Sequence, residues 1–234
     1  MKALMYFLGI IIFASAVGLN SGCKEKDQTP LSETQSAQQK ESGEATETPG
    51  LVAVSAEQAQ PLSIGAKVPT VLLKTVDGQT ADLVDLIKEK PTVLVFYRGG
   101  WCPYCNTQLG GLKEIEQQIL DAGWQIIAIS PDRPQKLSES IVKHQMKYKL
   151  FSDSKMEASK RFGIAFKVDE ATIEKYKGYG IDLDDASGEN HHLLPIPAVF
   201  LVGPDGVIKF TYANPDYKVR LDPQVLLSTV KAEL

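Results

Sequence analysis

Four short apolar runs dominate the C-terminal part of the chain. They are residues 92–97 (TVLVFY), 124–130 (WQIIAIS), 198–202 (AVFLV) and 207–212 (VIKFTY). The first three are nearly continuous in Val, Ile, Leu and Phe, which is typical of central strands covered on both faces. Between the first two runs, apolar residues recur at intervals of three and four: Leu109, Leu112, Ile115 and Ile119. This spacing predicts a helix from Pro103 to about Asp121 and hence a strand–helix–strand unit.

Turn residues complete the predicted fold. Residues 203–206 (GPDG) separate the last two apolar runs and predict an antiparallel hairpin. Residues 71–86 (VLLKTVDGQTADLVDL) indicate an earlier strand and turn, and residues 221–234 indicate a closing helix. We therefore expect one α/β domain over residues 62–234, with a central mixed sheet flanked by helices and an N-terminal strand or hairpin extension.

A long connection lies between Gly163 and Pro195, and it exceeds what a simple crossover needs. It contains a predicted short helix over residues 170–177 and is a candidate border of a functional site. His191 and His192 also lie in it. Two adjacent histidines alone rarely complete a metal site, so we interpret this pair as part of a polar loop.

The N-terminus has the layout of a secretory signal. Residues 3–22 carry no charge, follow Lys2 and end directly at Cys23. A transmembrane helix is the alternative, but the polar residues 20–22 and the adjacent cysteine favour cleavage. Residues 20–23 resemble the lipobox of bacterial lipoproteins, although Asn20 stands where that motif prefers a branched apolar residue. The resemblance implies a signal peptide over residues 1–22, a lipidated Cys23 and an exported, membrane-anchored protein of the cell envelope.

The segment over residues 23–61 has the composition of a flexible tether. It is rich in Ser, Thr, Gln and Glu, lacks aromatic residues, and cannot bury enough apolar surface to offset its ordering entropy. Three lysines and seven acidic residues lie in it, so nearly all of the chain's net charge of −4 belongs to this segment. The pI near 5.5 leaves no basic footprint, and we expect no nucleic-acid partner.

The candidate chemistry lies in residues 96–109 (FYRGGWCPYCNTQL), where Cys102 and Cys105 bracket the start of the predicted helix. Unpaired amides and the positive end of a helix dipole stabilise a thiolate at a helix N-terminus. Three residues of separation, one helical turn, let the second thiol close a disulfide with the first. Pro103 suits the first helical position, and Trp101 gives the exposed sulfur an aromatic neighbour.

Two other interpretations of the cysteine pair are weaker. A structural zinc site normally needs four Cys or His ligands. Outside the pair, the sequence offers only Cys23, His144, His191 and His192. Two inert core cysteines are equally disfavoured, because a Gly-Gly-Trp-Cys-Pro loop after a strand is not a packed core sequence. We therefore expect a redox pair without a metal or a cofactor, rather than a binding module that merely keeps the fold.

Together with IGAKVPTVLLKTVDGQTADL upstream and PAVFLVGPDGVIKF downstream, residues 96–109 resemble the alkyl hydroperoxide reductase/thiol-specific antioxidant family, the peroxiredoxins, within the thioredoxin fold. The resemblance implies a thiol-dependent peroxidase that reduces hydroperoxides and is recycled by a thioredoxin-like or other dithiol donor. It places Cys105 at the peroxidatic position, Pro103 at the family's Pro and Cys102 at the family's Thr.

The sequence departs from this family at two catalytic positions. Cys102 replaces the Thr, and Pro197 stands where the family has an Arg before a late strand. Thioredoxins instead carry a proline there, facing the Cys-x-x-Cys pair. A thiol-disulfide oxidoreductase acting on protein disulfides is therefore the alternative function.

Which sulfur attacks first stays open at this point. The helix position favours Cys102, the sulfur nearest the helix start, whereas the peroxiredoxin spacing favours Cys105. Arg98, by its closeness in sequence, and Arg220, by its place after the last strand, are the candidate cationic neighbours. For either one, a solvated surface arginine is an equally good interpretation.

Overall fold

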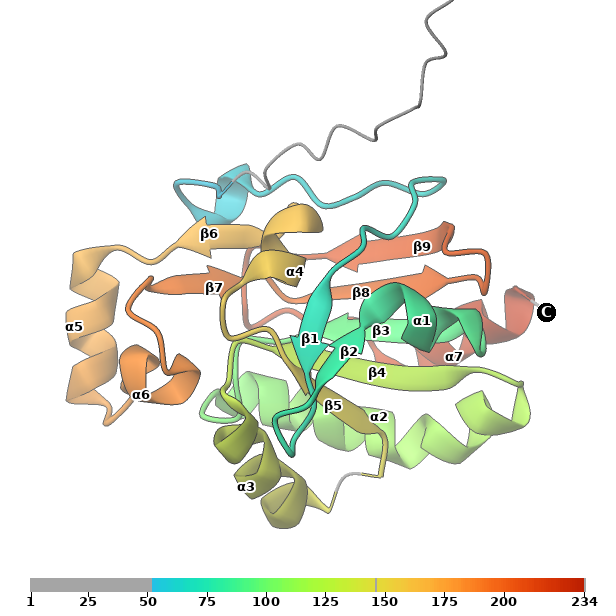
Figure 1. Cartoon of the computed structure of the whole chain (residues 1–234), viewed down its shortest axis with the longest axis horizontal. Coiled ribbons are helices and arrows are strands. Elements are labelled where there is room, and N and C mark those ends of the chain that lie inside the picture. Colours follow the sequence, from blue (N-terminus) through green and yellow to red (C-terminus); the bar gives the residue numbers. More distant parts are fainter. Residues whose placement is uncertain (1–51, 146, 234) are drawn as a thin grey trace, which may run out of the picture. The chain divides into compact units, whose positions relative to one another are not determined.

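The computed structural model describes residues 52–145 and 147–233, and Figure 1 shows their arrangement. In this part of the chain one large sheet forms the centre. Its strands are, in spatial order, β2 (Thr80–Asp82), β1 (Leu72–Lys74), β5 (Lys149–Ser152), β4 (Gln125–Ser130), β3 (Thr92–Phe96), β8 (Ala198–Val202) and β9 (Ile208–Ala213). β3, β4 and β5 run parallel, whereas β8 pairs antiparallel with β3 and with β9. The sheet is mixed, as predicted.

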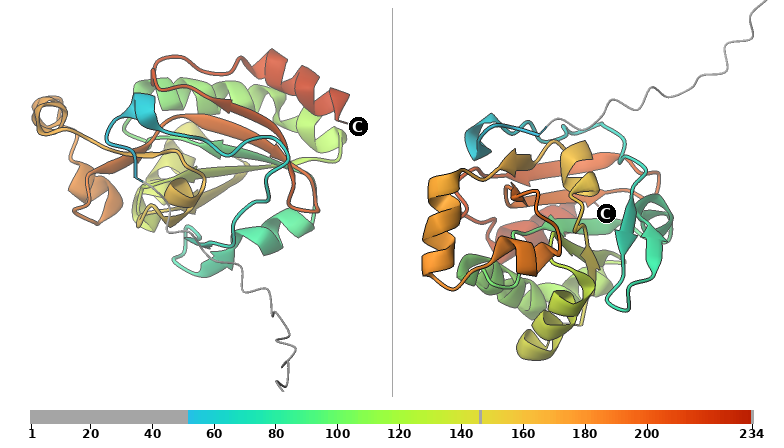
Figure 2. Two further views of the ribbon diagram at one scale, coloured as in Figure 1. Left: turned by 90° about the horizontal axis from the view of Figure 1, so that it is seen from above. Right: turned by 60° about the vertical axis from the view of Figure 1, so that its left-hand side comes forward.

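The helices in the described part of the chain are α1 (Leu83–Lys88), α2 (Pro103–Asp121), α3 (Pro134–His144), α4 (Glu157–Arg161), α5 (Glu170–Gly178), α6 (Leu183–Ser187) and α7 (Pro223–Ala232), with a short 3-10 helix at Ala56–Gln58. Helices α2 and α7 pack on one face of the main sheet and α1 and α4 on the other. A small antiparallel pair, β6 (Ala165–Lys167) and β7 (Leu193–Pro195), stands apart from the main sheet. Figure 2 shows α5 and α6 beside this small pair.

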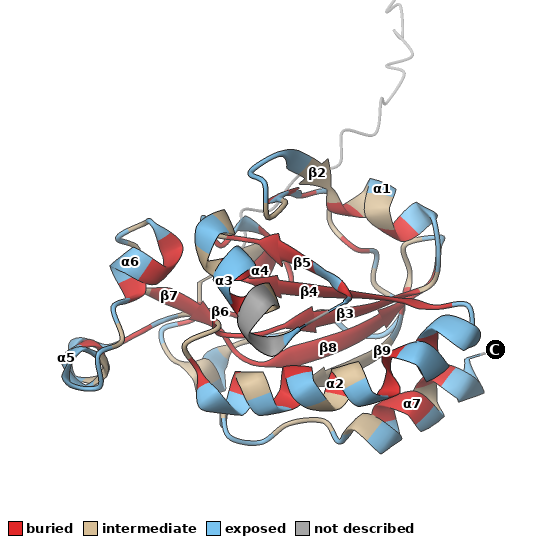
Figure 3. Cartoon of the chain, turned by 90° about the horizontal axis from the view of Figure 1, so that it is seen from below, coloured by how far each residue is buried: buried red, intermediate tan, exposed pale blue. Residues whose placement is uncertain are grey.

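The side chains of β3 alternate between two apolar cores. Val93 and Val95 join the cluster under α2 and α7, whereas Leu94 and Phe96 join the cluster under α1 and α4. Every residue of β3, β4 and β8 is buried, and Figure 3 shows these central strands buried along their length. The continuous apolar runs of the sequence follow from this double coverage.

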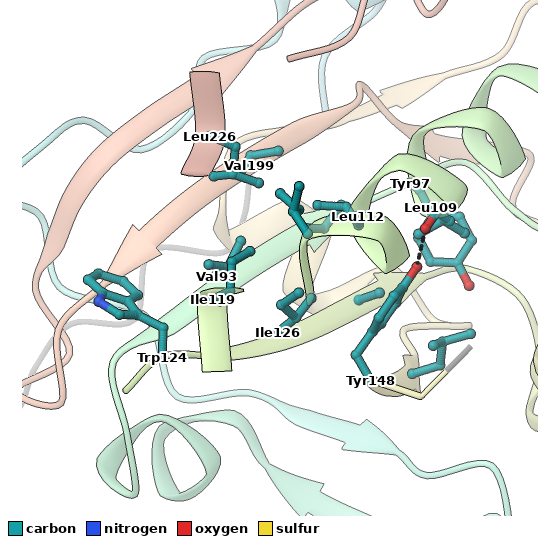
Figure 4. Close-up of a cluster of buried hydrophobic side chains, with 14 of the residues drawn as sticks. Val93, Tyr97, Leu109, Leu112, Ile119, Trp124, Ile126, Tyr148, Val199 and Leu226 are labelled. Atoms are coloured by element: carbon teal, nitrogen blue, oxygen red, sulfur yellow. Dashed lines mark hydrogen bonds between the residues drawn. The ribbon is translucent and has the colours of Figure 1, made fainter. Parts of the chain in front are cut away.

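Helix α2 is fixed to the sheet through the predicted apolar face. Leu109, Leu112 and Ile119 pack on the sheet in the cluster of Figure 4. The hydroxyl of Tyr148 also donates a hydrogen bond of 2.9 Å to the Leu109 carbonyl. Full burial of each such aliphatic side chain contributes about 1.5–3 kcal/mol. This packing holds the first turn of α2 in one place relative to β3.

Most predicted elements are confirmed. The antiparallel hairpin is β8 and β9, the strand–helix–strand unit is β3, α2 and β4 with its strands parallel, and the early strand and turn are β1 and β2. The short helix in the long connection is α5, and the closing helix is α7. The sequence pattern did not predict α1, β5, α3, α4, α6 or the β6–β7 pair.

The predicted tether ends later than the structure places the start of the domain. Ala53 pairs with β6, donating to the Ala165 carbonyl at 2.9 Å and accepting from the Lys167 amide at 2.9 Å. Ala56, Ala59 and Leu62 pack against the second apolar core. Residues 52–61 therefore belong to the folded domain, because their scattered small apolar side chains find a surface that the sequence alone does not reveal. The predicted signal and residues 23–51 lie outside the described residues.

No helix among the described residues is long and apolar enough to cross a membrane.

Candidate active site

The two cysteines lie where β3 gives way to α2. Cys102 occupies the N-cap position in extended conformation, Pro103 is the first helical residue, and Cys105 lies in the first turn. Both are free thiols, and their side chains are 1% and 0% exposed. The sequence placed both correctly at the helix start, but it expected a more exposed Cys102. Arginine side chains lie next to the two sulfurs, and aromatic side chains pack on Arg98.

Arg98 is the cation next to Cys102. Its Nη1 atom lies 4.0 Å from the Cys102 sulfur, and its Nη2 donates to the hydroxyl of Tyr176. The guanidinium carbon lies 5.2 Å from the Trp101 ring centroid, 5.5 Å from that of Tyr176 and 4.1 Å from that of Tyr217. Arg98 is only 3% exposed. Stacking on three rings and the phenolic acceptor stabilise this buried charge, so it is not a solvated surface arginine.

Arg220 is the cation next to Cys105. Its Nη2 lies 3.5 Å from the Cys105 sulfur. Its Nη1 donates to the carbonyl of Tyr217 and, at 3.1 Å, to that of Val219. These carbonyls orient the guanidinium towards the cysteine, although 115 residues separate the two in sequence. Each sulfur of the pair therefore has its own arginine.

The surroundings push the two thiol pKa values in opposite directions. A hydrogen bond from the Cys105 thiol lowers the pKa of Cys102 to about 6, and the Cys105 amide, Arg98 and Arg220 act in the same direction while burial opposes them. Burial raises the pKa of Cys105 well above its ordinary value, and the neighbouring Cys102 adds to this. At neutral pH the arrangement favours a thiolate on Cys102 and a thiol on Cys105.

A cavity of about 180 Å³ is lined in part by Arg98. Pro197 lines it together with Arg98, Tyr176 and Tyr217, and its other walls come mainly from the β6–β7 region and residues 56–57. Pro197 precedes β8, and its carbonyl accepts a hydrogen bond of 3.1 Å from the Asn214 amide. The structure thus brings Pro197 and Arg98 to one cavity.

Three further residues of the site were missed by the sequence analysis. Tyr176 comes from α5 and Tyr217 from the loop after β9, and both hold Arg98. Asp132 follows β4 and accepts a hydrogen bond from the backbone of the loop before Cys102. Only the length of the long connection indicated that α5 could border the site; no local pattern indicated the other two.

Trp101 and His191, also singled out from the sequence, pack and hydrogen-bond within the folded domain. Trp101 precedes Cys102, and its ring lies 5.7 Å from that of Tyr176. His191 hydrogen-bonds the Ser154 carbonyl and the Leu193 amide, so it holds a loop. Within residues 52–145 and 147–233, no three His, Cys, Asp or Glu side chains are grouped to hold a metal ion. Cys23 lies outside the described residues.

Similar proteins carry peroxiredoxin names. The chain is 31% identical over 104 residues to the putative peroxiredoxin bcp of Haemophilus influenzae and 30% identical over 104 residues to peroxiredoxin Bcp of Escherichia coli. Each match covers 44% of this chain and 66% of the relative. The chain therefore spans slightly less than two thirds of the length of these relatives.

Solved structures share the fold. Peroxidoxin BcpB from Mycobacterium tuberculosis superposes with a TM-score of 0.57 at 18% identity, over 73% of this chain and 97% of that one. The bacterioferritin comigratory protein of Xanthomonas campestris gives 0.56 at 17% identity, over 73% and 99%. These identities are low, so the likeness bears on the fold. It confirms the thioredoxin-like architecture.

A family model also matches the sequence. The model described as the AhpC/TSA family matches residues 64–211, which include both cysteines, Arg98 and Pro197. This range covers more than half of the chain and runs from the segment before β1 into β9. The chain belongs to the AhpC/TSA family.

Proposed function

We propose that this chain is a thiol-dependent peroxidase that reduces hydroperoxides through Cys102 and Cys105. The observation that carries the proposal is the 4.0 Å contact between Arg98 Nη1 and Cys102 Sγ at the start of α2. A helix N-terminus and a buried guanidinium both stabilise a thiolate. A second thiol one turn later can then resolve the oxidised product.

In the first step the Cys102 thiolate attacks one oxygen of the hydroperoxide. The sulfur–oxygen bond forms as the O–O bond breaks, and the leaving oxygen takes a proton from solvent to become an alcohol or water. Cys102 is thereby oxidised to a sulfenic acid. Arg98 contributes by its charge, which faces the sulfur and the oxygens on which negative charge develops.

In the second step Cys105 resolves the sulfenic acid. Its sulfur attacks Cys102, the disulfide forms, and the hydroxyl leaves as water with the thiol proton. Arg220, 3.5 Å from the Cys105 sulfur, stabilises the Cys105 thiolate as it forms. A thioredoxin-like or other dithiol then reduces the disulfide and is itself oxidised.

The relatives support a peroxide substrate. Those matched in sequence are named peroxiredoxins, and the solved structure of the Xanthomonas campestris protein concerns its alkyl peroxide reduction activity. The chain covers 66% of its named relatives, so their activity enters here as part of the proposal. The chain differs from the usual catalytic set by having Cys102 for Thr and Pro197 for Arg.

A thiol-disulfide oxidoreductase is the second candidate. Pro197 favours it, because a proline before this strand is the thioredoxin feature and because Pro197 shares a cavity with Arg98. In that case the same Cys102 thiolate attacks a disulfide of a client protein. A thiolate is the attacking species in both reactions.

The proposal includes a lipid anchor at Cys23. It is supported by the uncharged residues 3–22 that end at this cysteine and by the tether-like composition that follows. A lipidated Cys23 would hold the enzyme at a membrane of the cell envelope while the tether lets the domain reach its reductant.

One experiment separates the two reactions. The full-length chain in detergent is supplied with hydrogen peroxide, thioredoxin, thioredoxin reductase and NADPH, and an insulin reduction assay runs in parallel. We expect peroxide-dependent NADPH oxidation that Cys102→Ser abolishes. The opposite result is insulin reduction together with a peroxide reaction no faster than that of an unperturbed thiol of pKa ~8.5. It would favour the thiol-disulfide oxidoreductase over the peroxidase.

A further inference from the structure

The backbone of Gly100, two residues before Cys102, is hydrogen-bonded through both its N–H and its carbonyl group. Its N–H donates to Asp132 Oδ2 at 2.6 Å, and its carbonyl accepts from Asn106 Nδ2 at 2.9 Å. The Cys102 amide also donates to the Gly99 carbonyl at 3.1 Å. Three hydrogen bonds therefore hold the end of the loop from β3 to α2, just before Cys102.

The two glycines let this loop lie directly on Asp132 and α3. Gly99 has a φ of 145°, and a Cβ there would lie 2.8 Å from Asp132 Oδ1 and 2.3 Å from Trp101 Nε1. A Cβ on Gly100 would lie 2.1 Å from Ser140 Oγ. At Gly99 a side chain would also be strained by the positive φ, and at Gly100 it would displace the Ser140 hydroxyl. The close approach brings the Gly100 amide within reach of the carboxyl group.

The sheet explains how Asp132 reaches this loop. β3 and β4 are parallel neighbours, with Phe96 opposite Ile129, so the segments that follow them leave the same edge of the sheet. Asp132 is 1% exposed, and its Oδ1 atom has no hydrogen-bond partner among the described residues. Burying a carboxyl group with one oxygen unpaired is costly. A role for Asp132 beyond packing accounts for that cost.

We propose that Asp132 is a positioning residue for Cys102: its carboxyl group holds the Gly100 peptide so that the Cys102 sulfur stays at the N-terminus of α2 beside Arg98. The inference rests on the proposed function only in taking Cys102 as the attacking sulfur. Asp132 touches neither sulfur directly and acts through the loop. Asn106 completes the same clamp from the helix side.

Asp132 and Cys102 have different charged and titratable neighbours. Asp132 faces the backbone of Gly100, Ser130, and Lys136 and Glu139 of α3, and it also affects the phenol of Tyr97. Cys102 faces Cys105, Arg98 and Arg220. Asp132 is absent from the interactions that set the Cys102 pKa in the closed loop. A change at Asp132 should therefore alter the pKa of Cys102 by moving the loop.

The test measures the thiolate of Cys102 without any peroxide. Absorbance at 240 nm is followed from pH 4 to 9 on the reduced full-length chain, and the same chain carrying Cys102→Ser is subtracted. We expect Asp132→Ala to raise the pKa of Cys102 by about one pH unit, which is a tenfold change in thiolate at the lower pH values. Asp132→Asn keeps an acceptor oxygen for the Gly100 amide and should restore the value to within about half a unit.

Asp153 is the matched control. It is also a buried carboxyl, but it accepts from the amides of Ala158 and Ser159 at the start of α4 and is not bonded to the loop. Asp153→Ala should destabilise the fold and leave the pKa of Cys102 unchanged. If Asp132→Ala does not fold by circular dichroism, Asn106→Ala opens the same clamp and should raise the pKa in the same direction.

Three results would overturn the proposal. They are an unchanged Cys102 titration in the folded Asp132→Ala or Asn106→Ala chain, an equal change in Asp153→Ala, and a failure of Asp132→Asn to restore the value. None of these readings depends on peroxide turnover. A chain that passes this test yet reduces no peroxide would contradict the proposed function alone.

Discussion

The guanidinium Nη1 of Arg98 and the sulfur of Cys102 lie 4.0 Å apart, although one residue follows a buried strand and the other caps a helix. The turn through Gly99 and Gly100 brings them together. Three aromatic rings enclose Arg98. Because they exclude water, the attraction between the guanidinium and the Cys102 sulfur is less screened than it would be in solvent. The reactivity of the pair should depend on this contact.

Replacing Arg98 by Gln tests that dependence. Without the cation the pKa of Cys102 should rise, and oxidation of the pair by hydrogen peroxide at pH 7 should slow by about tenfold or more. Stopped-flow tryptophan fluorescence of the reduced chain measures the rate. Arg133→Gln removes a more exposed arginine paired with Asp185 and is the control. Equal rates in the two variants would show that Arg98 does not activate the thiolate.

Tyr176→Phe removes the phenolic acceptor of Arg98 and keeps the stacked ring. A hydrogen bond to a charged group contributes about 1.5–3 kcal/mol, and only part of this loss should reach the sulfur. We expect pair oxidation to slow by about fivefold, on the order of 1 kcal/mol. Tyr179→Phe, an exposed tyrosine just after the same helix, should have no effect. A slower Tyr179 variant would point to a general disturbance of α5.

The roles of the cysteines can be separated by trapping. In Cys105→Ser, one equivalent of peroxide should leave a sulfenic acid on Cys102, because the resolving thiol is gone. Dimedone labelling and mass spectrometry would locate the adduct. In Cys102→Ser, the buried Cys105 with its raised pKa should react no faster than an ordinary thiol. A dimedone adduct that forms rapidly on Cys105 would instead assign the attack to the position that peroxiredoxin spacing favours.

Asp132 should make folding stability depend on pH. Burial raises its pKa from 3.8 to about 7, so between these values the folded state keeps a proton that the unfolded state has released. Stability should therefore fall as pH rises from about 4 to about 7, by at most about 4 kcal/mol. Asp132→Asn should flatten this dependence in urea unfolding curves. The exposed Asp121→Asn should not, and a curve that keeps its slope in Asp132→Asn would assign the dependence to other groups.

Cys23 should carry the lipid. Mass spectrometry of the mature N-terminus is expected to show residues 1–22 removed and a lipid mass on Cys23. Cys23→Ser should yield an unlipidated product. An unmodified Cys23 within an intact precursor would contradict the lipoprotein proposal and leave the peroxidase proposal untouched.

The sequence predicted those parts of the fold whose pattern is local. The apolar runs of β3, β4 and β8 and the three- and four-residue spacing along α2 follow directly from the period of each element. Cys102 and Cys105 were placed at the start of α2 because strand, loop and helix follow one another in sequence. Two of the elements missed, α4 and α6, have five residues each and carry too few positions to show a period.

The sequence by itself determined the place of Cys102 and Cys105 at the start of a helix, that helix and the central strands, because residues a few positions apart decide each of them. Only the tertiary structure decided what surrounds the pair. Arg220 is 115 residues from Cys105 and Tyr176 is 78 residues from Arg98, yet sheet order and packing bring each beside its partner. Those contacts set the charge, burial and pKa of each sulfur. Our proposal that Cys102 is the attacking sulfur, a point left open by the sequence, therefore rests on the folded surroundings.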